Sequence, residues 1–261
     1  QKEEDVIFAL THNYTGYPMI RQARAMCQQG DLGNIRVIQA EYAQDWLTLD
    51  LENQPDSGGN KQASWRTDPS QSGSGGCIGD IGTHAYNLLR FITQLQPHQI
   101  SAELTSFVPG RKLDDNAQIS LRLNGGAKAT IWSSQIAPGN ENHLQIRVYG
   151  EKAGLEWCQE DPNYLYFTKY GSPKQKITRG GAGAISAANE VSRIPPGHPE
   201  GYLEGFANIY SDVANALIDK KNNEFDINKY HYPTVEDGLE GIRFIERSIA
   251  SSNSDSSWIN F

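Results

Sequence analysis

Hydrophobic residues recur three or four positions apart in four stretches of the chain, and residues at that spacing lie on one face of a helix. These stretches begin near Pro18, within the glycine-rich segment 73–82, near Tyr202 and after Pro233. Thr234 and Asp237 add the spacing of a capping box to the last stretch. In the last two helices we expect the apolar stripe to be buried: Leu203, Phe206, Tyr210, Val213 and Leu217, then Leu239, Ile242, Ile245 and Ile249.

Strands are predicted where apolar and polar residues alternate or where short apolar runs occur. They span residues 35–46, 100–108, 117–123, 127–136, 144–149, 154–158 and 164–169. The sequence Asn124-Gly125-Gly126 is a strong hairpin signal. Because most of these strands follow one another directly, we predict an α+β fold with a large, mostly antiparallel open sheet and helices packed on one face. The uncovered face favours a homodimer or homotetramer formed through the sheet.

Two segments do not fit this pattern. Residues 6–10 form a continuous apolar run, typical of a strand in a parallel sheet covered on both faces, yet no βαβ partner is evident in the sequence. We therefore expect residues 1–12 to be the last strand of an absent domain and residues 13–261 to form the domain outlined above. Residues 47–74 are polar and lack a period, which predicts a long loop of the kind that is usually functional or disordered.

Composition narrows the possible partners. A net charge of −8 and an isoelectric point near 5.3 argue against nucleic acid and anionic membranes, which attract basic surfaces. The three cysteines, Cys27, Cys77 and Cys158, are too few and too far apart for a disulfide framework or a zinc site, so we expect free thiols. No apolar run approaches membrane-spanning length. The partner is therefore expected to be a small molecule or another copy of the chain.

The central helix carries the most informative polar residues. Asp80 and His84 stand one helical turn apart near its start, and Asn87 extends the same stripe. A carboxylate beside an imidazole is suited to holding and exchanging a proton. Alternatively, Asp80 satisfies the helix dipole and His84 pairs with it, with no chemistry involved. The glycines before the helix indicate that the backbone comes close to a ligand or to another segment.

Two loops supply further candidates. Trp65 offers a stacking plane, and Arg66 and Asp68 offer donors and acceptors for hydroxyl-rich or anionic ligands. The alternative is an ordinary surface ion pair between Arg66 and Asp68. His198 lies in a constrained Pro/Gly loop, where a lone histidine is more often a plain polar residue than a ligand. Residues 180–184 are glycine-rich but lack the strand, helix and acidic residue of a dinucleotide fingerprint.

Taken in order, these motifs resemble the C-terminal domain of the Gfo/Idh/MocA family of nicotinamide-dependent oxidoreductases. The matching segments are residues 11–18 with 30–33, 65–69, 79–84, 197–202 and 233–238. The resemblance implies that His84 is the acid/base in oxidation of a sugar or polyol hydroxyl, and that Asp80 orients it or binds a neighbouring hydroxyl. It also implies a substrate pocket that includes Tyr14, Trp65, Arg66, Asp68 and His198.

In that family NAD or NADP is bound mainly by an N-terminal Rossmann domain. The glycine fingerprint and a catalytic lysine would lie before Gln1, so we expect no cofactor-binding residues in this chain, and weak cofactor binding and no turnover by the chain alone. Free thiols, and the usual location of enzymes of this family, predict a cytoplasmic location. Two other readings stay open at this point: a metal-dependent hydrolase or isomerase with Asp80, His84 and His198 as ligands, and a non-catalytic binding or oligomerisation module.

Overall fold

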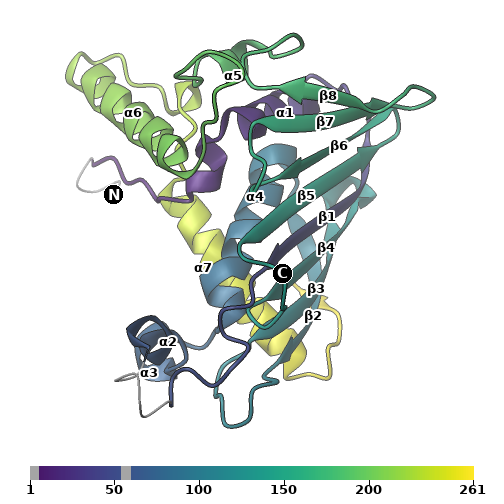
Figure 1. Ribbon diagram of the computed structural model, residues 1–261, viewed down its shortest axis with the longest axis vertical. Coiled ribbons are helices and arrows are strands. Elements are labelled where there is room, and N and C mark those ends of the chain that lie inside the picture. Colours follow the sequence, from purple (N-terminus) through teal and green to yellow (C-terminus); the bar gives the residue numbers. More distant parts are fainter. Residues whose placement is uncertain (1–5, 54–59) are drawn as a thin grey trace.

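The computed structural model describes residues 6–53 and 60–261 (Figure 1). Its described strands form one sheet of nine, in the order β8-β7-β6-β5-β1-β4-β3-β2-β9. Neighbours are antiparallel except β1 and β4, which run parallel. The strands are β1 (Ile35–Ala43), β2 (Pro97–Thr105), β3 (Asn116–Leu123), β4 (Lys128–Ser134), β5 (His143–Gly150), β6 (Ala153–Cys158), β7 (Tyr164–Lys169), β8 (Gln175–Thr178) and β9 (Ile259–Asn260). The predicted α+β class is confirmed.

Helices cover one face of this sheet (Figure 1). Helix α4 packs on β1, β4 and β5. Helix α7 packs on β2, and helix α1 packs on β6 and β7. The helices are α1 (Pro18–Gln28), α2 (Lys61–Arg66), α3 (Pro69–Ser72), α4 (Thr83–Thr93), α5 (Ser186–Asn189), α6 (Tyr202–Lys221) and α7 (Val235–Ser252), with short turns η1 (Asn13–Gly16), η3 (Ile78–Gly82), η4 (Asn124–Gly126) and η5 (Ile227–Lys229). The opposite sheet face is free of helices, and association of copies through it stays a prediction.

Strand residues that point toward the helices form the core. Trp157, Ile38 and Ile146 are at most 1% exposed and lie in the same cluster as Leu88 and Leu89 of α4. The Asn124–Gly126 turn joins β3 and β4 as predicted, and Gly125 and Gly126 take φ values of 78° and 87° that favour glycine. Two short strands, β8 and β9, were not predicted because they are only four and two residues long.

Residues 6–10 are predicted to be the last strand of a separate domain, and this stays a prediction. The backbone there is extended but outside the sheet, and the Leu10 N–H donates to the Pro233 carbonyl at 2.8 Å. Ile7 and Ala9 pack against the small cluster built on Ile209 of α6. Residues 1–5 of the expected segment 1–12 lie outside the described residues.

The long loop predicted at 47–74 contains two helices, α2 and α3. Asn60 caps α2, since its side chain accepts hydrogen bonds from the N–H groups of Gln62 and Ala63. Asp68 caps α3 in the same way by accepting from the Ser70 N–H at 3.0 Å. Both helices are shorter than two turns, which leaves too few residues for a helical period in the sequence.

The buried stripes predicted for the last two helices are largely wrong. Leu203, Tyr210 and Leu217 of α6 are 76%, 60% and 53% exposed, and Leu239 and Ile242 of α7 are 56% and 58% exposed. Each helix instead buries one large apolar residue among small or polar ones: Ile209 with Gly205, Asn208 and Ala216 on α6, and Phe244 with Ser248 and Ser251 on α7. The periodicity therefore identified the helices correctly but assigned the wrong inner face.

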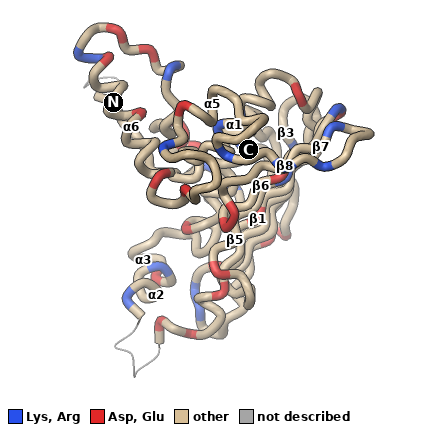
Figure 2. Tube along the Cα trace, turned by 45° about the horizontal axis from the view of Figure 1, so that its top comes forward, with Lys and Arg blue, Asp and Glu red and all other residues tan. Residues whose placement is uncertain are grey.

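Charge is distributed without a single-signed region. Figure 2 shows Lys and Arg interspersed with Asp and Glu over the described part of the chain. That nucleic acid is not a partner stays a prediction. No helix within the described ranges is both long and apolar enough to cross a membrane.

Candidate active site

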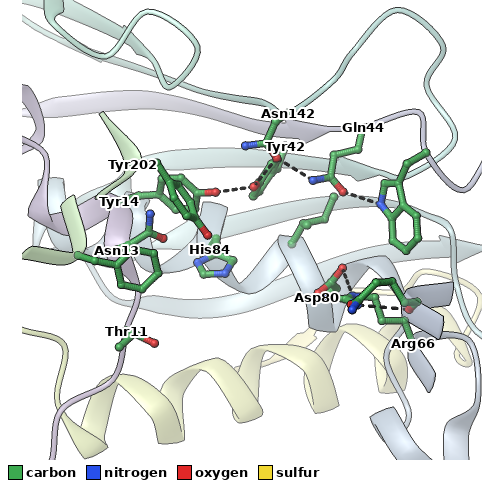
Figure 3. Close-up of a pocket in the computed structure, with 14 residues that line it drawn as sticks. Thr11, Asn13, Tyr14, Tyr42, Gln44, Arg66, Asp80, His84, Asn142 and Tyr202 are labelled. Atoms are coloured by element: carbon green, nitrogen blue, oxygen red, sulfur yellow. Dashed lines mark hydrogen bonds and ion pairs between the residues drawn. The ribbon is translucent and has the colours of Figure 1, made fainter. Parts of the chain in front are cut away.

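A cavity of about 630 Å³ lies where β1 ends, beside the start of α4 (Figure 3). Its walls come from segments that are distant in sequence and that the fold brings together. They are Thr11, Asn13, Tyr14, Tyr42, Gln44, Trp46, Gln62, Arg66, Asp80, Ile81, His84, Asn142, Tyr202 and Phe206. Most of these side chains carry hydrogen-bonding groups, so the cavity suits a ligand with several hydroxyls.

The glycine-rich segment before α4 is held by Asp114. The Asp114 carboxylate accepts hydrogen bonds from the N–H groups of Gly76 and Ile78, at 2.6 and 2.8 Å, and its carbonyl accepts from the Cys77 N–H at 2.8 Å. A Cβ atom on Gly76 would overlap that carbonyl oxygen. Of the two predicted reasons for the glycines, close approach to another segment is therefore confirmed for Gly76.

His84 is paired with another histidine rather than with Asp80. The Nδ1 atoms of His84 and His12 are 3.1 Å apart, and the two rings are nearly perpendicular. Burial and, to a smaller extent, the neighbouring His12 together lower the pKa of His84 to about 3. Burial also lowers the pKa of His12, against the opposing charge of Asp237. Both rings are neutral at neutral pH, so one proton lies between the two Nδ1 atoms.

Asp80 takes part in a different set of contacts. Its Oδ2 accepts from Arg66 Nε at 3.1 Å (Figure 3). It also accepts from Gln135 Nε2 at 2.7 Å. The predicted contact of Asp80 with His84 is replaced by these contacts, since Arg66 and Gln135 hold the Asp80 carboxylate and His12 pairs with His84. The alternative ion pair between Arg66 and Asp68 is also wrong, since Arg66 pairs with Asp80 and Asp68 caps α3.

A chain of hydrogen bonds fixes the side chains on the β1 side of the cavity. Tyr42 donates its hydroxyl to Asn142 Oδ1 at 2.8 Å, and the Tyr14 and Tyr42 hydroxyl oxygens are 2.5 Å apart. Because a phenol has one proton, Tyr14 must donate to Tyr42, and its own oxygen is left as an acceptor. Gln44 also donates to Asn142 Oδ1, at 2.7 Å. Tyr14 was predicted, whereas Tyr42, Gln44 and Asn142 were not.

Asn13 is a further residue that the sequence analysis missed. It is 2% exposed and borders the cavity, yet its Nδ2 atom has no hydrogen-bond partner among the described residues. Leaving a buried donor unpaired costs about 1–3 kcal/mol. A ligand oxygen in the cavity would satisfy this donor. The sequence signal that could have identified Asn13 was its position next to Tyr14 in the motif.

The remaining predicted site residues lie outside this cavity. Trp65 borders a second cavity of about 400 Å³ that shares Arg66, Asp80 and His84 with the first. Asp68 is half-buried and His198 is exposed, and neither lines either cavity. The metal site proposed from Asp80, His84 and His198 is not formed, because within the described residues the group with metal-ligand spacing is instead His143, Cys158 and Glu160.

The lowered pKa of His84 predicts a loss of stability in acid. The unfolded chain binds a proton near pH 6.5, whereas the folded chain binds it only near pH 3, so the free energy of unfolding falls as pH decreases through that window. At about 1.4 kcal/mol per pKa unit, His84 should remove about 2 kcal/mol between pH 7 and pH 5. Urea unfolding of the parent and of His84→Gln at both pH values measures this. An equal pH dependence in the two proteins would contradict the burial of a neutral His84, and exposed His98→Gln is the control.

Residues 20–156 match the family model described as the GFO/IDH/MocA C-terminal domain. The chain belongs to this family. The oxidoreductase YfiI of Bacillus subtilis, itself uncharacterized, is 36% identical over 259 residues, which are 98% of this chain and 65% of that protein. The chain therefore spans about 65% of the length of this relative.

Solved structures agree with the family assignment. An oxidoreductase from Sinorhizobium meliloti is 50% identical with a TM-score of 0.84, over 98% of this chain and 65% of that chain. An inositol dehydrogenase homolog from Azotobacter vinelandii, complexed with NAD+, is 32% identical with a TM-score of 0.94, over 100% of this chain and 66% of that chain. Levoglucosan dehydrogenase, at 20% identity and a TM-score of 0.84 over 99% of this chain and 67% of that chain, shows the shared fold.

Proposed function

We propose that this chain is the substrate domain of an NAD- or NADP-dependent dehydrogenase that oxidises a hydroxyl of a sugar or polyol. The observation that carries the proposal is the 630 Å³ cavity, in which the neutral imidazole of His84 meets a wall of hydroxyl, amide and carboxylate groups. Such a site favours vicinal hydroxyls, each of which needs a donor and an acceptor. The Azotobacter homolog has also been solved with NADH and myo-inositol, at 31% identity to this chain.

Substrate hydroxyls would be held by three groups that the fold has fixed in advance. The Tyr14 oxygen accepts, the Asn13 amide donates, and the Arg66–Asp80 pair offers both donors and an acceptor. Because hydrogen bonds to Tyr42 and Gln135 already orient Tyr14 and Asp80, these two side chains lose little conformational entropy on binding.

His84 would take the proton of the reacting hydroxyl. When its Nδ1 proton is donated to His12, its Nε2 carries the lone pair that a base needs. The pKa of about 3 means that a positive charge on buried His84 is disfavoured. Transfer of the Nδ1 proton to His12 as Nε2 gains the substrate proton keeps His84 neutral and moves the charge to His12. Asp237 favours the charged form of His12.

The nicotinamide cofactor supplies the hydride acceptor when it is bound. The residues of this chain that fit its reactive end line the 400 Å³ cavity, because that cavity shares His84 and Asp80 with the polyol cavity. Thr83 and the 73–76 backbone provide polar groups there, and Ile242 and Ile245 of α7 provide an apolar wall. The exposure of Ile242 is consistent with a surface that something else covers.

Substitution of His12 distinguishes a role of this residue in proton transfer from a role in orienting His84. We expect His12→Phe and His12→Gln both to lower kcat on the order of 10²-fold, with little change in KM, because neither side chain accepts and passes on a proton at neutral pH. The pH dependence of kcat should change as well. Full activity in His12→Gln would mean that His12 only orients His84, and the relay would be wrong.

A turnover assay tests the proposal as a whole. The protein expressed from its complete gene is incubated with NAD or NADP and a panel of inositols and monosaccharides, and reduced nicotinamide is followed by absorbance. We expect reduction with at least one polyol and one cofactor. No reduction with any member of the panel would contradict the proposed substrate class.

A further inference from the structure

Strand register gathers a second group of reactive side chains on the helix-free face of the sheet. Glu41 of β1 pairs with Gln145 of β5, and Gln145 pairs with Cys158 of β6, so these three side chains form a row across the face. His143 is two residues from Gln145 on the same strand and therefore shares that face. Glu160 follows in the turn after β6.

The potential ligand atoms in this group converge. His143 Nδ1 lies 3.1 Å from Glu160 Oε2 and 3.8 Å from Cys158 Sγ. The three ligand atoms all lie within 4.8 Å of one another. Zinc bonds of about 2.0–2.3 Å at tetrahedral angles put nitrogen and oxygen ligands roughly 3.3 Å apart, and nitrogen and sulfur ligands roughly 3.6 Å apart. The observed separations are close to both values.

We propose that His143, Cys158 and Glu160 form a binding site for a divalent transition metal, for which Zn²⁺ is the natural probe. Imidazole nitrogen, thiolate sulfur and carboxylate oxygen are all zinc ligands, and three of them leave a fourth position for water. This site does not depend on the proposed dehydrogenase function. It differs from the expectation, drawn from sequence spacing, that the cysteines lie outside any zinc site.

The neighbouring residues support metal binding. Glu41 Oε1 lies 3.2 Å from His143 Nε2, which is the carboxylate–histidine–metal arrangement that fixes the ring and directs Nδ1 at the ion. Binding displaces the Cys158 thiol proton to solvent, and the thiolate and the Glu160 carboxylate then balance the two charges of the ion. Arg147, 3.5 Å from Glu41, holds that carboxylate in place.

A metal here would tie the start of β5 to the end of β6 next to the polyol cavity. Asn142, which precedes His143, accepts the Tyr42 hydroxyl through its side chain and donates its N–H to Glu160 Oε1 at 3.1 Å. The ion would therefore fix the cavity wall through the residue adjacent to its histidine ligand, and we expect Zn²⁺ to raise the melting temperature.

Calorimetric titration with Zn²⁺ tests the site in the protein expressed from its complete gene, after treatment with EDTA and dialysis. We expect one Zn²⁺ to bind at this site, and Co²⁺ to give a thiolate charge-transfer band. Glu41→Gln should weaken Zn²⁺ binding about 10–100-fold, and Cys158→Ser and Glu160→Gln, which remove ligands, should weaken it more. Cys27→Ser, a half-buried thiol outside the group, is the matched control and should leave binding unchanged.

The variants make the outcome decisive. Glu160 is exposed, so its substitution leaves the fold intact even if Cys158→Ser disturbs β6. Absence of Zn²⁺ binding in the parent, or binding of equal strength in the parent and in Glu160→Gln, would overturn the proposal. The cluster would then be an ordinary ion-pair network around His143.

Discussion

His84→Ala is expected to lower kcat by about 10²–10⁴-fold in the protein expressed from its complete gene, the range that a positioned acid/base contributes. The loss follows because no other histidine lines the cavity among the described residues, so the substrate hydroxyl has no neutral base within it. KM should change little, since Tyr14, Asn13 and the Arg66–Asp80 pair would hold the hydroxyls. Steady-state kinetics on the active polyol measures both constants.

The matched control is His98→Ala, which removes an exposed imidazole at the start of β2. It should leave both constants unchanged. If His84→Ala were as fast as the parent, the proton would be taken by another group and the role proposed for His84 would be wrong. A rise in KM with kcat intact would instead assign His84 to binding alone.

Glu200→Ala is expected to reduce the free energy of unfolding by about 3–5 kcal/mol, the usual cost of breaking a buried ion pair from one side. Glu200 and Arg179 are each 2% exposed and are 2.9 Å apart. Glu200 Oε1 also accepts from the N–H groups of Arg193 and Ile194, at 2.6 and 2.8 Å. The variant leaves a buried guanidinium without its carboxylate. Urea unfolding followed by tryptophan fluorescence measures the change.

His198→Ala is the control for this prediction, because it alters the same loop at an exposed position. The loop uses the His198 carbonyl, which accepts from Arg179 Nη2 at 2.6 Å, and a backbone carbonyl survives the substitution. We expect a change within about 0.5 kcal/mol. If both variants lost the same free energy, the loop would depend on the imidazole, and the buried pair would not be its anchor.

Local periodicity explains why much of the fold was predictable. The capping box of Thr234 and Asp237 is formed, and the turn at Gly125 joins β3 to β4. Burial was harder to predict, because it depends on what lies opposite a helix. Leu203 has an apolar side chain at the right spacing and is nonetheless 76% exposed.

The candidate site was predictable where its residues sit in one motif. Asp80, His84 and Tyr14 all border the cavity, as the family resemblance implied. Asn142 could not be found in this way, since it reaches the cavity through the pairing of β1 with β5, a contact between residues about 100 positions apart. The His12–His84 pair depends on the same kind of long-range contact, and His12 was not singled out although it lies within the 11–18 motif.

Isotope transfer tests the central claim, that a polyol hydroxyl is oxidised in this cavity by hydride transfer. The polyol that gives turnover is prepared with deuterium on its ring carbons and incubated with the protein expressed from its complete gene and the oxidised nicotinamide. We predict that mass spectrometry finds one deuterium in each reduced nicotinamide formed by the parent, and that His84→Ala forms this product far more slowly. Reduced cofactor without deuterium, or equal rates in the two proteins, would contradict the account.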